Sequence, residues 1–299
     1  MRDLHAASCA TFRQACDALV PHAFTLEAAE QWALQRASSL AADRFRLTSF
    51  WHLDSFMQQA SGEKTRRYTR RLAQAENYGI AVGLPSPLRD THRALVGEDS
   101  REILRSRQLH DDVDRTALID LVMGHVSPAG HGVMLDHVLR DKYALRSRLF
   151  ADETETVLRR KGLNAIKGSK PHILVVGATA GMIGALVNRR FEVSATDMLP
   201  DIVGINLCGV TVSAETENGR LMRAADLAII TGMTLANRTL PALVEAAKTH
   251  NTSTMIWAIT GRNFGPYYID HGVDCVISDP SPFFLLPGPA KLGIWRREL

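Results

Sequence analysis

One stretch of the chain, residues 171–197, constrains its fold more than any other. An apolar run from Ile173 to Val176 is typical of a buried parallel strand, and glycines follow at positions 177, 181 and 184. A short helical stretch and a second strand come next, and the second strand ends on Asp197. Small residues let a backbone approach a ligand at a helix N-terminus, and an acid after the second strand can accept hydrogen bonds from ribose hydroxyls. This order predicts a strand–turn–helix unit that binds an adenosine cofactor.

The glycine spacing leaves a second interpretation open. It is G-x-x-x-G-x-x-G rather than the usual G-x-G-x-x-G, so the glycines could serve only the close packing of a helix on a sheet. The residues expected to contact a cofactor are those of the turn and of the neighbouring strand ends: Gly177, Ala178, Thr179, Gly181, Gly184, Asp197, Met198, Thr231 and Gly232. Among them, Asp197 could chelate both ribose hydroxyls, or else cap a helix or lie at the surface.

The C-terminal half alternates between strand and helix patterns. Expected strands are 172–176, 191–196, 209–213, 227–230, 253–259, 273–277 and 291–295, and a helix is expected over 239–250. Alternation of this kind implies parallel pairing of the strands, with helices on both faces of the sheet. We therefore predict an α/β fold with a Rossmann-like, mostly parallel sheet over residues 166–299.

The first half is predicted to form an α-helical N-terminal or cap domain over residues 1–165, because its apolar residues recur at helical spacing. Helices are expected over 3–20 and 26–42, in an aromatic-rich core segment over 43–75, and in two or three segments of 98–160. Residues 78–87 are rich in Gly and Pro and predict an irregular break, and residues 124–132 interrupt the later helices.

Composition and charge exclude several classes of protein. A net charge of +3 is too slight to indicate a nucleic-acid partner, and the basic run 64–71 is expected to be a solvated helix face. No apolar run approaches the ~20 residues of a membrane-spanning helix. The four cysteines have no metal-type spacing and indicate reduced thiols in a cytoplasmic protein. The histidines at positions 110, 125, 131 and 137 match no metal-ligand spacing either, so we expect no metal site.

Polar and aromatic residues after the fourth and fifth expected strands mark a second end of the site. The segment 231–239 is dense in Thr and Asn, and it could position a substrate amine or carboxylate or equally form a helix-capping loop. Tyr267 and Tyr268 could pack against a cationic ligand, because ring faces attract cations, although such residues more commonly build a core.

Two family resemblances cover the C-terminal half. The segment from Val175 to Gly184 with Asp197, and the strand after Ala225, resemble the nucleotide-binding core of class I S-adenosylmethionine-dependent methyltransferases. The segment from Asp226 to Leu240, continuing to residues 271–274, is similar to the Rossmann-like family labelled as heavy-metal chelation proteins. That second resemblance spans roughly residues 170–299, but no cysteine or histidine cluster supports its metal label.

The order of a helical domain and a methyltransferase-like domain also resembles nicotianamine synthases and bacterial azetidine-2-carboxylate synthases. In the latter, S-adenosylmethionine is itself the substrate, and its α-amine attacks its own γ-carbon to release methylthioadenosine. The resemblance implies a group that accepts the amine proton and aromatic faces beside the sulfonium. Asn237, Tyr267 and Tyr78 are the candidate catalytic residues for these roles.

These observations predict a cytoplasmic enzyme that binds S-adenosylmethionine, as cofactor or substrate, and acts on a small molecule by methyl transfer or by cyclisation. No nucleic-acid or membrane partner is expected, and a homodimer is left open. One alternative is a non-catalytic Rossmann-like protein that binds a metal or another ligand. Another is an NAD-dependent oxidoreductase, although no Tyr-x-x-x-Lys pair occurs in the chain.

Overall fold

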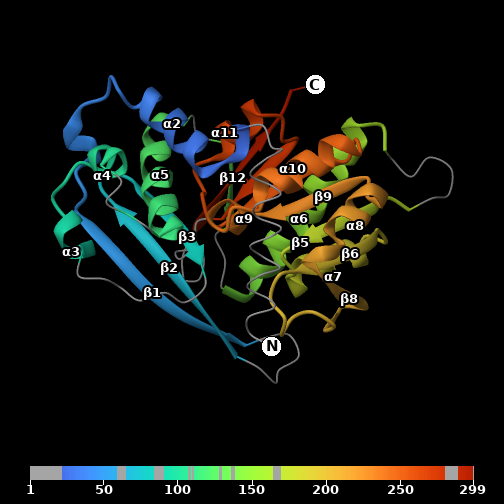
Figure 1. Ribbon diagram of the computed structural model, residues 1–299. Helices are drawn as coiled ribbons and strands as arrows, with labels where there is room; N and C mark the ends of the chain where they lie inside the picture. Colours follow the sequence, from blue (N-terminus) through green and yellow to red (C-terminus); the bar gives the residue numbers. More distant parts are fainter. Residues whose placement is uncertain are drawn as a thin grey trace.

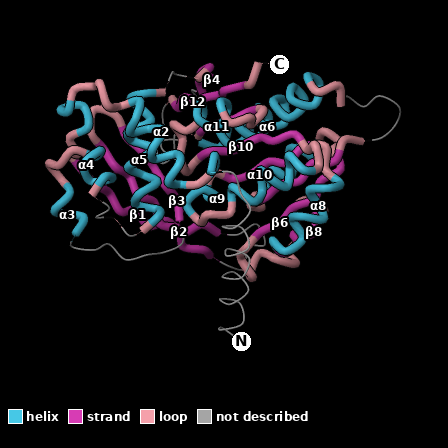
Figure 2. Tube along the Cα trace, turned by 45° about the horizontal axis from the view of Figure 1, so that its top comes forward, coloured by secondary structure: helices cyan, strands magenta, loops and turns pink. Residues whose placement is uncertain are grey.

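A computed structural model of the chain describes residues 22–58, 65–83, 91–106, 109, 111–127, 130–135, 139–163, 170–279 and 289–298. The helix expected over residues 3–20 lies outside this range. The described part contains a large sheet with helices on both faces and a smaller sheet beside it (Figures 1 and 2).

The large sheet has nine strands among the described residues, in the order β4-β12-β11-β10-β9-β5-β6-β8-β7. Its strands are β4 (His131–Leu135), β5 (His172–Val176), β6 (Glu192–Asp197), β7 (Asn206–Leu207), β8 (Val210–Ala214), β9 (Leu227–Thr231), β10 (Ser253–Ala258), β11 (Cys275–Ser278) and β12 (Ala290–Arg296). The pairs from β11 to β8 are parallel, whereas β4, β12 and β7 join antiparallel at the two edges. The predicted Rossmann-like, mostly parallel sheet is thus confirmed, and only the edge strands β4 and β7 were not expected.

Helices cover both faces of this sheet because its central strands are apolar on both sides. In β5, Ile173 and Val175 pack with helices α6 (Leu139–Arg160) and α7 (Ala180–Asn188), while Leu174 and Val176 join the opposite cluster. That opposite cluster includes residues of α8 (Asn218–Ala224), α9 (Met233–Ala236), α10 (Leu240–Thr249) and α11 (Gly265–Asp270). Successive side chains of β5 face two different apolar layers, and this explains why its sequence is a continuous hydrophobic run.

The aromatic-rich segment 43–75 is not helical, contrary to the sequence prediction. It forms β1 (Ser49–Gln58) and β2 (Thr65–Gln74), which pair antiparallel, and β3 (Tyr78–Gly83) adds a third strand where an irregular break was expected. Aromatic and threonine side chains favour a pleated sheet, and this preference outweighs the approximate helical spacing that suggested a helix. The first half is therefore mixed, with helices α2 (Leu26–Arg36), α3 (Thr91–Leu95), α4 (Ser100–Arg105) and α5 (Asp112–Val126) around this small sheet.

The basic run 64–71 is likewise not a solvated helix face. Most of it lies in β2, where Arg71 is fully buried and its Nε donates a 2.7 Å hydrogen bond to Asp114 of α5. The other carboxylate oxygen of Asp114 lies 2.7 Å from the ring Nε2 of buried His92. The arginine is tolerated in the interior because its charge is paired there.

Helix α5 joins the small sheet to the rest of the molecule. Gly79 of β3 lies so close to it that an added Cβ would be 2.1 Å from the Ala117 carbonyl oxygen and from the Leu121 amide nitrogen. Asp120, on the same helix, accepts hydrogen bonds from the backbone N–H groups of Ile80 (2.8 Å) and Asn263 (2.7 Å). One helix thus fastens β3 to the loop after β10.

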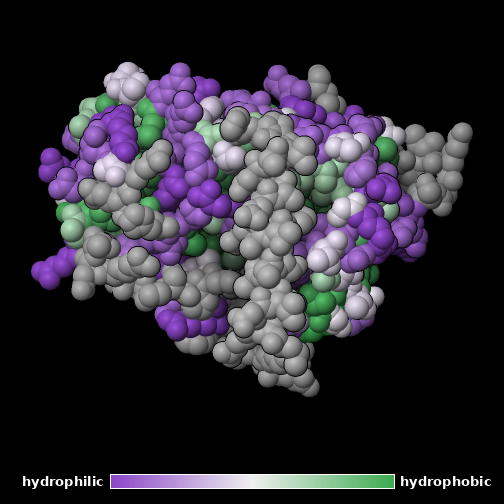
Figure 3. Space-filling model, viewed as in Figure 1, coloured by the Kyte–Doolittle hydropathy of each residue, from purple (hydrophilic) through white to green (hydrophobic). Residues whose placement is uncertain are grey.

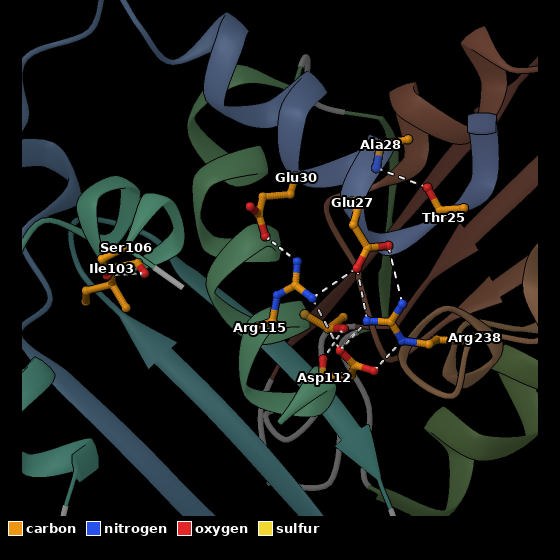
Figure 4. A network of polar contacts seen from close by, with 10 residues as sticks. Thr25, Glu27, Ala28, Glu30, Ile103, Ser106, Asp112, Arg115 and Arg238 are labelled. Atoms are coloured by element: carbon orange, nitrogen blue, oxygen red, sulfur yellow. Dashed lines mark hydrogen bonds and ion pairs between the residues drawn. The ribbon is translucent and has the colours of Figure 1, made fainter. Parts of the chain in front are cut away.

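A surface network of ion pairs joins the same parts of the fold (Figure 4). The guanidinium of Arg238, between α9 and α10, donates to Asp112 of α5 (2.6 Å) and to Glu27 of α2 (3.0 Å). Arg115 of α5 donates to Glu27 (3.2 Å) and to Glu30 (2.8 Å). On the face seen in Figure 3 the described surface is mostly hydrophilic, with apolar residues in small patches. No helix in the described part of the chain is both long enough and apolar enough to cross a membrane.

Candidate functional site

The carboxyl ends of β5 and β9 meet at the point where the strand order of the large sheet reverses. Strand β5 pairs with β6 on one side and with β9 on the other, and ligands of open α/β sheets bind outside such a switch point. Gly177 follows β5 with φ = +90°, and a Cβ there would lie 2.6 Å from Cγ2 of Thr231. A Cβ on Gly232 would lie 2.3 Å from the Thr260 carbonyl oxygen. Close packing accounts for Gly177, which agrees with the second interpretation that the glycine spacing left open, and it accounts for Gly232 as well.

Asp197 lies beside the glycine turn, as expected, and its carboxylate serves the backbone of that turn. Oδ2 accepts a hydrogen bond from the Ala178 N–H (3.1 Å) and Oδ1 accepts one from the Leu199 N–H (3.0 Å). The residue is 8 % exposed. Its carboxylate holds the ends of β5 and β6 together, and contact with a ribose stays a prediction.

Asn237 reaches the same place from the loop after α9. Its Nδ2 lies 3.3 Å from Sδ of Met198, and its Oδ1 accepts from the backbone N–H (3.2 Å) and the hydroxyl (2.7 Å) of Thr239. These last two contacts, with the residue two positions further on, are those of an Asx turn that precedes α10. The side chain thus bridges the loops after β6 and β9, and its amide oxygen is occupied.

The other two predicted glycines lie within α7. Gly184 faces the β7–β8 hairpin, where an added Cβ would lie 3.1 Å from Sγ of Cys208, so its role is packing. Gly181 lies on the first turn of α7, and an added Cβ would lie 3.3 Å from Oγ of Ser147 on α6. Gly181 therefore leaves room beside the start of α7, where the first N–H groups have no intrahelical acceptor.

Two predicted catalytic residues do not join this group. Tyr267 is buried in α11, its ring lies 5.5 Å from that of Trp32, and its hydroxyl donates to the carbonyl of Ala23. Burial raises the pKa of the Tyr267 hydroxyl above its usual range, so the hydroxyl stays protonated and cannot serve as the base. Neighbouring Tyr268 is fully buried in the same core. Tyr78 starts β3, and its ring lies 4.2 Å from the guanidinium carbon of Arg262.

Charged residues gather over the ends of β10 and β11 instead. Arg146 of α6 donates a 2.7 Å hydrogen bond to Oδ2 of Asp279, which follows β11 and is 1 % exposed. The guanidinium carbon of Arg146 also lies 5.3 Å from the ring of Trp257. Lys142 lies one helical turn before Arg146 and is fully buried. Arg262 follows β10, and its guanidinium is attracted by the negative charge of Asp279.

A small pocket connects this charged cluster to the start of α7. Its lining comes from α6, α7 and β10, and consists of Arg146, Ser147, Phe150, Thr179, Gly181, Met182 and Trp257. The cavity volume is about 30 Å³, room for a water molecule or a few ligand atoms. Oγ1 of Thr179 is buried here without a hydrogen-bond partner among the described residues. A ligand that entered would meet the start of α7, this hydroxyl and the Arg146 guanidinium.

The described residues contain no group of three or more His, Cys, Asp or Glu side chains placed to hold a metal ion. Of the four histidines considered in the sequence, positions 110 and 137 lie outside the described residues, and His131 lies in β4. The ring of His125 packs edge-on against Phe45 at 4.8 Å, and burial lowers its pKa. Cys208 is exposed and Cys275 is buried, and both are free thiols.

Arg146, Arg262 and Asp279 were not among the site residues predicted from the sequence. The rule that polar residues after parallel strands mark a site could have found two of them, because Arg262 follows β10 and Asp279 follows β11 directly. No comparable signal marks Arg146, which lies within a long helix and reaches the site only through the packing of α6 on the sheet.

The fold and the strand-end site define a mixed α/β protein with a Rossmann-like sheet. Residues 164–274 match the family DUF364, described as "Putative heavy-metal chelation". A DUF364 protein of unknown function from Desulfitobacterium hafniense has a similar structure, with 10 % identity, a TM-score of 0.55, and coverage of 91 % of this chain and 99 % of that one. A DUF364 protein of unknown function from Pyrococcus horikoshii gives 12 % identity, a TM-score of 0.49, and coverage of 91 % and 99 %. No curated protein matches the chain.

Proposed function

We propose that the chain binds a small molecule at the carboxyl edge of the large sheet, between the start of α7 and the charged cluster of α6. The observation that carries the proposal is one pocket that is lined both by the start of α7, with the buried Thr179 hydroxyl, and by Arg146 of α6. A polar hydroxyl buried without a partner is costly, and a ligand atom would satisfy it.

S-adenosylmethionine is the first ligand to test. Support comes from the turn after β5 and the acid after β6, which are adjacent, and from the resemblance to methyltransferase cores. Asp197 would contribute its remaining acceptor capacity, since each carboxylate oxygen has a second lone pair. If the bound molecule reacts, methyl transfer and cyclisation are the two candidate reactions, and neither Tyr267 nor its hydroxyl would take part.

A metal is the second candidate, and the family description favours it. The described side chains offer no cluster of ligands for a bare ion, whereas the Arg146 guanidinium at the pocket would suit a metal carried by an anionic chelator. This version predicts that the purified protein takes up metal only together with such a chelator. Metal analysis after dialysis, with and without citrate, would distinguish uptake of the ion from uptake of the complex.

Titration calorimetry with S-adenosylmethionine and with methylthioadenosine tests the first candidate. We expect heat of binding at a ligand concentration of about 1 mM or below. Gly181→Trp provides the matched variant, because a large side chain would fill the space beside Ser147, and the exposed position lets the helix keep its fold. Binding that is equal in both proteins would place the ligand elsewhere, and no binding of either compound would remove S-adenosylmethionine as the ligand.

A further inference from the structure

The guanidinium of Arg262 has buried hydrogen-bond donors that no described residue satisfies. Its Nε and Nη1 atoms are both buried and have no hydrogen-bond partner. The group is held in place from one side, since its carbon atom lies 4.2 Å from the ring centre of Tyr78. A buried donor without an acceptor is costly, and more so when it carries charge. An arginine kept in this position therefore indicates an acceptor that binds from outside the chain.

Arg262 shares a carboxylate with a second arginine. Asp279 attracts Arg262, and one oxygen of that carboxylate already accepts a hydrogen bond from Arg146 at 2.7 Å. Burial lowers the pKa of Arg262 to about 10, and the charge of Asp279 opposes this shift. We call Arg146, Arg262 and Asp279 the cationic corner, in which two arginines interact with one carboxylate.

We propose that the cationic corner binds the carboxylate or phosphate group of a ligand that also reaches the pocket at α7. The inference rests on the proposed function and adds the chemical class of the ligand: an anion with at least two acceptor oxygens. The two separate buried donors of Arg262 require such a group, because a single acceptor atom cannot serve both of them.

Tyr78 acts here as a positioning residue. Its ring faces the guanidinium of Arg262, and its carbonyl oxygen accepts a 3.1 Å hydrogen bond from Nδ2 of the adjacent Asn263. The cation–π attraction orients the guanidinium without using any of its N–H groups. The donors are thereby left for the anion. The small sheet thus contributes one residue to the site of the large sheet.

The test compares Arg262→Met with Arg36→Met. Arg36 is a matched control because its guanidinium lies 4.3 Å from the ring of Trp32, but it is half exposed and lies on α2. We measure the melting temperature and the calorimetric affinity with inorganic phosphate and with citrate, against chloride at equal ionic strength. Phosphate and citrate distinguish a phosphate-specific corner from a carboxylate-specific one.

The expected result has two parts. Without added anion, Arg262→Met melts at or above the wild-type temperature, because its unsatisfied donors are gone. With anion, Arg262→Met loses affinity for phosphate or citrate by roughly tenfold or more, the scale of a charge-assisted hydrogen bond, while Arg36→Met keeps it. Equal affinity in Arg262→Met and wild type would overturn the inference. If Arg262→Met does not fold, Arg262→Lys replaces it, and undiminished anion affinity in that variant would overturn the inference as well.

Methylthioadenosine, which carries no anionic group, separates this inference from the proposed function. If methylthioadenosine binds wild type and Arg262→Met alike while the variant loses anion affinity, both proposals are supported. Anion binding that depends on Arg262, together with no methylthioadenosine binding, supports the cationic corner and removes the adenosine ligand. If methylthioadenosine binds and the anion affinity does not depend on Arg262, the proposed function stands and the inference about the cationic corner is overturned.

Discussion

At the scale of single residues, Asp197 shows how a side chain that fits a sequence pattern for ligand binding can also hold the local backbone. The pattern places an acid after the second strand to bind ribose, and the structure uses both carboxylate oxygens for backbone N–H groups of the turns. The glycine turn and the acid were predictable because they are local in sequence. Arg262 was not predictable, because its importance comes from its burial and from its contact with the ring of Tyr78. These two residues are far apart in the chain.

We expect Asp197→Ala to lower the free energy of unfolding by about 1–3 kcal/mol, because two backbone N–H groups would lose a charged acceptor. Asp197→Asn is the matched variant. It keeps one oxygen acceptor, so its loss should be smaller. Urea denaturation followed by circular dichroism measures both. An unchanged midpoint in Asp197→Ala would show that the carboxylate does not stabilise the turn.

Asp120 predicts a pH dependence of stability. Burial raises the pKa of its carboxyl from 3.8 to about 8, although backbone hydrogen bonds from Ile80, Asn263 and Arg262 oppose the shift. Between these two values the folded protein holds a proton that the unfolded chain has released, so stability falls as the pH rises. The contribution is complete below the unfolded pKa and is lost as the pH passes the folded pKa.

The measurement is the free energy of unfolding of wild type minus that of Asp120→Asn, which cannot titrate at this position. We expect this difference to decrease between about pH 5 and about pH 8 and to level off above that range. Parallel pH profiles for the two proteins would show that the Asp120 carboxyl titrates in its ordinary range.

At the scale of elements, the contact between β3 and α5 is the tightest place in the small sheet. Gly79→Ala would put a Cβ 2.1 Å from two backbone atoms of α5, atoms that cannot move without bending the helix. We expect a loss of stability of about 3 kcal/mol or more, at the upper end of overpacking effects. Melting temperatures measured by calorimetry test this.

Gly219 supplies the control for that prediction. It lies within α8, and an added Cβ would meet nothing within 4 Å. Gly219→Ala should therefore raise stability by about 0.5–1 kcal/mol through helix propensity. A Gly79→Ala protein as stable as Gly219→Ala would mean that β3 does not lie against α5 as described.

The elements that could be predicted are those whose pattern is decided locally. Strands β5, β6, β8, β9 and β10 were placed to within a residue or so, because runs such as 172–176 are apolar on both faces of a buried sheet. Strands β1 and β2 were missed since their aromatic residues also fit a helical spacing. Their true state depends on pairing with β3 and on the Arg71–Asp114 contact with α5, which no local pattern encodes.

At the scale of the whole molecule, one hydrophobic core runs through both sheets. The same cluster contains Phe45 and Leu118 from the first half and Ile230 and Leu243 from the second. Helix α6, which precedes the expected boundary at residue 165, contributes Phe150 and Leu158 to the other face of the large sheet. Both hydrophobic clusters therefore contain residues of the two predicted domains.

This shared core predicts how a fragment of residues 166–299 would behave. It would lack α6 and β4, and it would expose apolar residues of α9 and α11 that α5 and Trp32 of α2 contact in the full chain. Exposing a hydrophobic face costs a large free energy compared with the small net free energy of unfolding of a domain. We expect the fragment to show no cooperative thermal transition, while the full chain unfolds in one transition by both circular dichroism and tryptophan fluorescence. A cooperative transition in the fragment would instead establish the C-terminal half as an independent domain, and the strand-end site would then have to be assigned without α6.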